Sequence, residues 1–369
     1  MSEQVFSAQR LAVGYHNKAV VQEIEIQLNR GQILTLIGPN GSGKSTILKS
    51  IAGHLKPLQG VVWLDGRDMA SLSGKEIAQR LSVALTQRLR PERMTCEDVV
   101  ATGRYPFTGR LGFLSAEDKE KVAAALELVH GLALRDRDFN AISDGQRQRI
   151  ILARAICQEP ELIVLDEPTS YLDVKFKLEL LNLLKTMVRE KQVAVILSLH
   201  ELELAQKVSD LVLCVKDGCI EKYGAPQEVF QSDYIQHLYD LTEGSYNHLL
   251  GCLELASPGG PPQVFVIAGG GRGIPVFRQL QRQGISFATG ILHENDIDWE
   301  IGKSLAHAVV AEEAFEPIGA ETLKRGKRLM AQCGRVICCL QKFGAMNRGN
   351  QELLAHAAAL GLPVEQVAP

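Results

Sequence analysis

Hydrophobic and polar positions in the first 255 residues follow two periodicities. Residues 5–28 alternate with a period of two, which predicts paired strands joined by a turn at 14–17. Short continuous apolar runs predict buried strands at 32–37, 60–64, 162–165, 193–199 and 211–215. Helical periodicity predicts helices over 115–130 and 174–190. Parallel strands joined by helices form an α/β sheet, here with a helical insert at about 88–158.

A second series of predicted strands and helices begins after a linker segment. The segment is Ala256-Ser257-Pro258-Gly259-Gly260-Pro261-Pro262, where proline and glycine oppose both helix and strand. Beyond it, strands are expected at 263–268, 286–291, 307–311, 335–340 and 363–367, and helices at 274–283, 320–332 and 350–360. We therefore expect two domains, residues 1–255 and a smaller α/β domain at 263–369, with residues 256–262 as the linker.

Composition narrows the class of protein. The chain has 369 residues, 46% of them hydrophobic and 22% charged, which is typical of a globular protein with more than one domain. A net charge of −3 argues against a nucleic-acid partner. No apolar run reaches the roughly 18–20 residues of a bilayer span, and the N-terminus lacks a signal-peptide core. We expect a cytoplasmic protein with eight free cysteines that meets a membrane only through a partner.

A phosphate-binding loop follows the strand at 32–37. Its pattern is Gly, four free positions and Gly-Lys-Ser/Thr, and its residues are Gly38, Pro39, Asn40, Gly41, Ser42, Gly43, Lys44, Ser45 and Thr46. Glycines let backbone N–H groups approach phosphates, and the helix predicted directly after the loop favours an anion at its N-terminus. Lys44 can reach the β and γ phosphates, and the Ser45 hydroxyl can ligate Mg²⁺. The sequence therefore predicts a nucleoside triphosphate site.

Two carboxylates follow the apolar strand at 162–165. They are Asp166 and Glu167, and the segment has the form of a Walker B motif. Asp166 is expected to hold the hydration shell of Mg²⁺, and Glu167 to polarise the water that attacks the γ-phosphate. Together with the phosphate loop, this pair predicts hydrolysis of ATP with Mg²⁺ as the cofactor.

With these motifs, residues 1 to about 255 resemble the ATP-binding-cassette (ABC) ATPase subunits of transporters. The resemblance implies a P-loop NTPase fold with a RecA-like core, an antiparallel β subdomain and a helical subdomain. It implies that Tyr15 stacks on adenine and that Gln87 senses Mg²⁺ and the γ-phosphate. It also implies that His200, which closes the strand at 193–199, is the switch histidine.

Two further motifs of the resemblance concern a second subunit. Ser143, Asp144, Gly145 and Gln146 match the signature motif, which contacts ATP bound to another cassette, and residues 170–173, ending at Asp173, match the D-loop. Because the chain has one set of motifs, the resemblance implies a homodimer with two composite ATP sites. Asp144 stands where the family usually has glycine, and it could tune affinity or cap the following helix.

A finer resemblance suggests the kind of transport. Gly103-Arg104-Tyr105-Pro106 and the turn at 224–229 are similar to ATPases of the iron–siderophore, haem and cobalamin uptake class. This implies an importer with separate integral-membrane permease subunits, which would dock around Gln87 and residues 88–110. A substrate-binding protein would be an indirect partner, and the chain would lie at the cytoplasmic side of the inner membrane. Two alternatives stay open, an ATPase of another transport system and a soluble ABC protein acting on ribosomes or DNA.

The domain at 263–369 has weaker signals. A Gly-rich turn at 269–273 lies between a predicted strand and a helix, which favours a ligand-binding edge, with an anion among the candidate ligands. We favour a regulatory domain over an enzymatic one. Cys333, Cys338 and Cys339 could indicate a metal or redox site. The last two would point to opposite faces of a strand, which favours buried structural cysteines instead.

Overall fold

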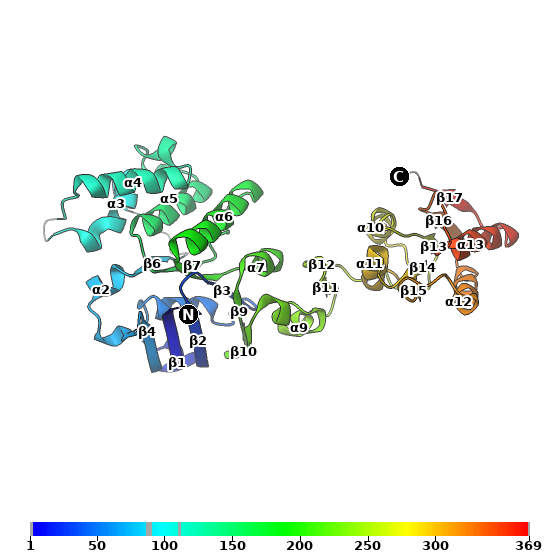
Figure 1. The fold of residues 1–369 in the computed structure, drawn as a ribbon, viewed down its shortest axis with the longest axis horizontal. Coiled ribbons are helices and arrows are strands. Elements are labelled where there is room, and N and C mark those ends of the chain that lie inside the picture. The colour runs from blue at the N-terminus through cyan, green and yellow to red at the C-terminus, as the bar shows by residue number, and fades with distance from the viewer. Residues whose placement is uncertain (1–2, 86–90, 110–111, 368–369) are drawn as a thin grey trace. The chain divides into compact units, whose positions relative to one another are not determined.

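The computed structural model describes residues 3–85, 91–109 and 112–367. The chain forms two compact units, residues 1–234 and 235–369 (Figure 1). The first unit begins with an antiparallel sheet of order β2-β1-β4-β5. Its strands are β1 (Gln4–Tyr15), β2 (Lys18–Asn29), β4 (Gln59–Leu64) and β5 (Arg67–Asp68). In the described part of the chain, no helix is both long and apolar enough to cross a bilayer.

A second sheet, of order β10-β9-β3-β8-β7-β6, forms the centre of the first unit. Its neighbours run parallel except β10, which is antiparallel to β9. The strands are β3 (Ile33–Ile37), β6 (Leu81–Ala84), β7 (Leu162–Asp166), β8 (Ala194–Ser198), β9 (Leu211–Lys216) and β10 (Cys219–Gly224). Every residue of β3, β7 and β8 is buried, which explains why these strands are continuous apolar runs in the sequence.

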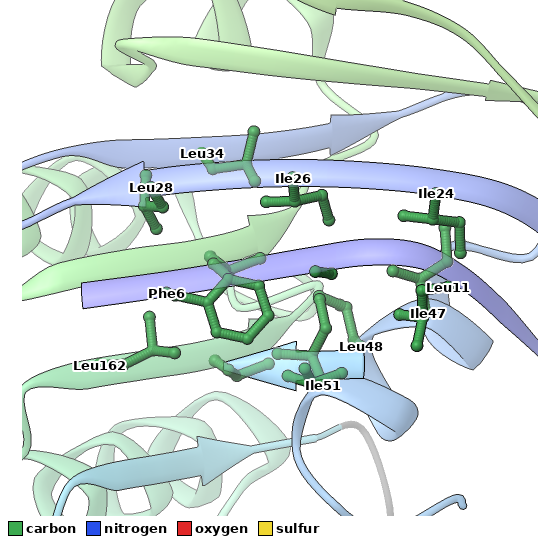
Figure 2. Close-up of a cluster of buried hydrophobic side chains, with 14 of the residues drawn as sticks. Phe6, Leu11, Ile24, Ile26, Leu28, Leu34, Ile47, Leu48, Ile51 and Leu162 are labelled. Carbon is green, nitrogen blue, oxygen red and sulfur yellow. The ribbon is translucent and has the colours of Figure 1, made fainter. Parts of the chain in front are cut away.

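One hydrophobic core joins the two sheets. Figure 2 shows Phe6 of the antiparallel sheet beside Leu48 and Ile51, which belong to the helix α1 (Lys44–Ile51), and Leu162 of β7. The remaining helices of this unit outside the insert are α2 (Gly74–Ala78), α6 (Val174–Lys191), α7 (Leu202–Val208) and α8 (Pro226–Val229), while α9 (Ser232–Leu238) spans the division between the units. Because α1 begins at the phosphate loop, this core fixes the position of the loop.

The helical insert contains α3 (Cys96–Ala101), the 3₁₀ segment η2 (Thr102–Phe107), α4 (Ala116–Leu128) and α5 (Asp144–Cys157). Thr95, Ser115 and Ser143 begin its three α-helices, each with a reciprocal capping box. These side chains satisfy backbone N–H groups that a helix leaves unpaired at its start. The expected helix at 115–130 is therefore α4, and its predicted cap at Ser115 is present.

Arg104 lies inside this insert. Its Nε donates to Asp118 Oδ1 (2.8 Å) and its Nη1 to the Cys157 carbonyl (2.9 Å), and the Arg104 side chain is 5% exposed. Hydrogen bonds from Arg104 and from Ser115 lower the pKa of Asp118 to about 2. The contribution of this pair to stability is therefore present above the ordinary pKa of 3.8 and is lost as the pH falls towards 2. Of the Gly-Arg-Tyr-Pro segment, the arginine thus has a structural role.

Replacing Arg104 with leucine should lower the free energy of unfolding by about 3–5 kcal/mol, because it leaves a buried carboxylate without its partner. Urea denaturation at pH 7 would measure the loss. Arg135→Leu is the control, since Arg135 also pairs with a carboxylate, that of Glu97, but lies on the surface. An Arg104→Leu midpoint equal to that of the control would contradict a structural role.

The second unit contains a five-stranded parallel sheet of order β15-β14-β13-β16-β17. Its strands are β13 (Val264–Ile267), β14 (Phe287–His293), β15 (Ala308–Glu312), β16 (Arg335–Cys338) and β17 (Val364–Gln366), and its helices are α10 (Ile274–Arg282), α11 (Ile297–Leu305), α12 (Ala320–Met330) and α13 (Arg348–Ala359). Two separate core clusters cover the two faces. Cys333, Cys338 and Cys339 are free thiols within these clusters, and burial raises the pKa of Cys339 to about 12.

Two features of this unit differ from the sequence-based expectation. The apolar pattern of the sequence does not predict the helix α11, because Asp298 and Gly302 interrupt it. In the structure both residues lie on the buried face of this helix. A hairpin, β11 (Ser245–Asn247) and β12 (Cys252–Glu254), packs with the second unit rather than the first. Glu254 accepts a hydrogen bond from Arg278 (2.7 Å), and Leu250 packs on the core that contains α10 and α11. The division thus falls about twenty residues before the expected one.

Candidate active site

The phosphate loop connects β3 to α1. Gly38, Gly41 and Gly43 have φ values of 143°, 81° and 108°, which favour glycine. A Cβ on Gly38 would lie 2.0 Å from the Val215 carbonyl oxygen, and one on Gly43 would lie 2.3 Å from the Val21 side chain. The loop is therefore held between the central sheet and β2, in a backbone shape that leaves its N–H groups accessible to phosphate.

Lys44 is the first residue of α1, and its side chain folds back over the loop. Its Nζ donates to the carbonyl oxygens of Gly38 and Pro39, both at 2.8 Å. Burial lowers the pKa of Lys44, while the nearby carboxylates of Glu167 and Asp166 act in the opposite direction. The ammonium group is thus placed at the mouth of the loop, where the sequence predicts the β and γ phosphates.

The Mg²⁺ candidates meet at the end of β7. Ser45 Oγ donates to Asp166 Oδ1 at 3.2 Å, and Asp166 is 2% exposed. A hydroxyl and a carboxylate supply the oxygen ligands that Mg²⁺ prefers, so these residues fit the ion. When bound, Mg²⁺ would neutralise charge on the β and γ phosphate oxygens. Gln87, the third candidate, lies outside the described residues.

Ser198, which no sequence motif marks, contacts both the Asp166 carboxylate and the backbone of Glu167. Its Oγ donates to Asp166 Oδ1 (2.7 Å) and accepts a hydrogen bond from the Glu167 backbone N–H (2.9 Å). The signal was a hydroxyl at the end of an otherwise apolar strand, Ala194–Ser198. Such a residue in a buried strand must find polar partners, and here they are the site itself.

Glu167 and His200 contact each other directly. His200 Nε2 lies 2.5 Å from Glu167 Oε1, and Ser170 Oγ donates to the other carboxylate oxygen at 3.2 Å. The backbone of Glu167 has a positive φ of 50°, which a non-glycine residue adopts only when its surroundings impose it. Two of the three expected catalytic residues, Glu167 and His200, are therefore together, while Gln87 lies outside the described residues.

The signature motif begins α5. Ser143 Oγ accepts a hydrogen bond from the Gln146 N–H (3.3 Å), and Gln146 Oε1 accepts one from the Ser143 N–H (3.0 Å). Asp144 instead pairs with Arg147 at 2.7 Å on the surface. The cap of this helix is therefore Ser143, and the suggestion that Asp144 caps it is wrong.

The D-loop lies beside the signature motif of the same chain. Asp173 caps α6 by accepting a hydrogen bond from the Phe176 N–H at 3.0 Å. A Cβ on Gly145 would lie 3.1 Å from the Tyr171 carbonyl oxygen.

Tyr15 is half-exposed at the end of β1, on the hairpin whose Val21 contacts the phosphate loop. Its stacking on adenine stays a prediction.

Known proteins show the class of protein to which this chain belongs. Residues 21–170 match the family model of the ABC transporter, and residues 287–368 match the MJ0874 family. An uncharacterised ABC transporter ATP-binding protein of Methanocaldococcus jannaschii is 42% identical over 289 residues, covering 78% of this chain and all of the relative. The chain therefore belongs to the ABC transporter ATP-binding proteins. It is an ABC-type ATPase that binds ATP, with an additional C-terminal α/β region.

Further relatives carry transport names. A probable siderophore transport system ATP-binding protein of Bacillus subtilis is 36% identical, covering 65% of this chain and 88% of the relative. A cobalamin import ATP-binding protein of Halobacterium salinarum is 30% identical, covering 77% of this chain and 73% of the relative. A solved metal-chelate type ABC transporter, in an inward-facing conformation, aligns with a TM-score of 0.57 at 27% identity, covering 64% of this chain and 90% of that one.

Proposed function

We propose that this chain is the ATP-hydrolysing subunit of a membrane importer whose cargo is a ferric siderophore, haem or cobalamin. The observation that carries the hydrolytic role is the placement of Glu167, held by His200, beside Asp166 and the phosphate loop. The siderophore and cobalamin names of its relatives support the kind of cargo. The chain would act at the cytoplasmic side of the inner membrane, where permease subunits anchor it.

The chemistry follows from the charges at the site. Lys44 and the loop N–H groups stabilise negative charge on the transferred phosphoryl group. Glu167 orients the attacking water, and His200 holds the carboxylate in place. Ser143 and Gly145 of a second copy would complete the site, which gives a homodimer with two ATP molecules. A solved ATP-binding cassette of the same fold, bound to ADP and phosphate, is a dimer, which is in line with this arrangement.

A surface groove supports docking to a permease. Its volume is about 460 Å³, and it lies between the α2–β6 segment and α5. Apolar side chains form much of its lining, among them Ile77, Leu81 and Ile151. Gln79 in the loop after α2 donates to the Pro106 carbonyl (3.0 Å), so the groove adjoins the segment that carries the exposed Tyr105. An apolar helix end of a membrane subunit fits such a groove.

Ile77→Asp should reduce recovery of the permease about tenfold when the chain is co-expressed with its neighbouring permease genes and purified, because it puts a charge into the apolar groove. Leu360→Asp is the matched control, since Leu360 is a half-exposed leucine of the second unit. ATP binding should be unchanged in both variants. Recovery with ribosomes or DNA alone would favour the soluble ABC alternative, and a permease for another cargo would favour a different transport system.

We further propose that the C-terminal α/β domain, residues 263–369, regulates the ATPase. The phosphate loop, Walker B segment, signature motif and switch histidine all lie within residues 1–234. A regulator acts by binding differently to two states of the cassette dimer. The hairpin at 245–254 packs with the second unit, so the working boundary for experiments precedes this hairpin.

A chain that ends at Gly244 should keep basal ATP hydrolysis and lose any response of the rate to ligands of the second unit. A chain that ends at Ser257 is the comparison, because it retains the hairpin but removes the core on which Leu250 packs, and we expect it to be less soluble. Steady-state hydrolysis with and without cell-extract metabolites would measure the response. Loss of nucleotide binding in both truncated chains would show that the domain is structural instead.

A further inference from the structure

The second unit has a cavity at the carboxyl edge of its parallel sheet. The cavity has a volume of about 520 Å³ and lies among the loops that follow β13, β14, β15 and β16. Gly270, Asp296, Phe315 and Met346 come from these four loops in turn. Open α/β sheets bind ligands at this edge, where the strand order reverses, here between β13 and β16. The cavity is in the unit without the ATP site, and the proposed hydrolysis does not use it.

The glycine loop at this edge already has carboxylate partners. Both oxygens of Asp298 accept the Gly273 N–H (3.1 and 3.0 Å), and Asp296 Oδ2 accepts the Gly270 N–H at 2.7 Å. Asp298 is 0% exposed, and burial raises its pKa, with the nearby Asp296 adding to the effect. Two of the N–H groups that would cradle a phosphate, those of Gly270 and Gly273, are thus bound to acidic side chains. An anion is therefore disfavoured here, against the expectation from the sequence.

Asp296 supplies the carboxylate of the cavity lining, and the neighbouring Asn295 adds an amide with both donor and acceptor atoms. Each oxygen of Asp296 accepts one backbone N–H, from Gly270 or from Asp298 (2.9 Å), and a carboxylate oxygen can accept more than one hydrogen bond. His293 Nε2 lies 2.9 Å from the Glu316 carbonyl oxygen, so this ring nitrogen is the donor of that hydrogen bond. A ligand with donor groups can therefore pair with the free acceptor positions of Asp296.

Three apolar side chains of the lining are exposed. Ile297 is 43%, Phe315 78% and Met346 39% exposed, and all three line the cavity. Phe315 also has a positive φ of 66°, which a bulky residue rarely adopts. A flat ring could cover these side chains, and an aromatic face attracts a cationic ring more than a neutral one.

We propose that this cavity binds a small molecule with a flat ring and cationic or donor groups, which pairs with Asp296 and stacks on Phe315. This proposal rests on the proposed regulatory role of residues 263–369. It names the class of ligand to which the ATPase would respond. Its test measures binding alone, so its failure would leave the proposed ATPase function untouched.

The probe is benzamidine, a planar ring with a donor-bearing cation, and benzoate is its anionic counterpart of the same shape. The full chain is labelled with ¹³C at the methionine methyl groups, and Met346→Leu identifies the Met346 signal among the six methionines. Benzamidine should shift this signal saturably with a Kd on the order of 1 mM, as expected for a fragment of this size. Benzoate and inorganic phosphate should leave it unchanged.

Two variants make the test specific. Asp296→Asn, which keeps an acceptor for the Gly270 N–H, should raise the Kd for benzamidine at least about tenfold. Phe315→Ala should raise it about fivefold, and Phe113→Ala, which removes an equally exposed phenylalanine of the first unit, should not. The proposal is overturned if benzoate or phosphate shifts Met346 as strongly as benzamidine. It is also overturned if benzamidine has no effect on Met346 at about 10 mM, ten times the expected Kd.

Discussion

Replacing Glu167 with glutamine is expected to lower the rate of ATP hydrolysis at least about 100-fold while leaving ATP affinity close to wild type. The amide has the size of the carboxylate and can keep the contacts with His200 and Ser170. It lacks the charge that polarises the attacking water. Because we expect the two cassettes to separate only after hydrolysis, the variant should accumulate as a dimer with ATP bound.

Phosphate release under saturating ATP, with the permease complex assembled, measures the rate, and equilibrium titration of a fluorescent ATP analogue measures the affinity. Glu203→Gln is the matched control, since Glu203 lies on the nearby helix α7 and pairs with Lys207 on the surface. The control should hydrolyse ATP at the wild-type rate. A Glu167→Gln rate equal to that of the control would show that another group orients the water.

Lys44→Ala should affect ATP binding, the step before hydrolysis. It should weaken this binding at least about 100-fold, because two charge-assisted hydrogen bonds to phosphate would be lost. Lys44 Nζ is buried at the mouth of the loop, where water replaces it poorly. Lys49→Ala removes the same charge from the last turn of the same helix and should bind ATP normally.

Equilibrium titration would separate these two lysine variants, and a thermal melt without nucleotide would confirm that both are folded. An ATP affinity of Lys44→Ala within threefold of that of Lys49→Ala would contradict the role assigned to the loop. The outcome also distinguishes the two site predictions, since only Glu167→Gln should combine normal binding with lost turnover.

Much of the fold could be predicted because its strands carry unambiguous patterns. Strands β3, β7 and β8 are buried on both sides, so their sequences are unbroken apolar runs. In β2, buried and exposed positions alternate from Ile24 to Leu28, so this part of the strand has the expected period of two, whereas most of β1 is buried on both faces. The phosphate loop and the Asp166–Glu167 pair could be located because their spacing is local in the chain.

Features that depend on distant partners could not be predicted. Arg104 has no sequence signal of burial, since its partners Asp118 and Cys157 are 14 and 53 residues away. Asp298 is a polar residue in a buried place, which periodicity alone assigns to the surface. The hairpin at 245–254 was assigned to the cassette because the Pro-Gly segment follows it, although its packing partners lie beyond that segment.

The central claim is that a second copy of this chain completes each ATP site through Ser143 and Gly145. Light scattering of purified Glu167→Gln, with and without ATP and Mg²⁺, tests it most directly. We predict a particle of twice 40.4 kDa with ATP, one nucleotide per chain, and the single-chain mass without it. A single-chain mass at saturating ATP would contradict the composite site.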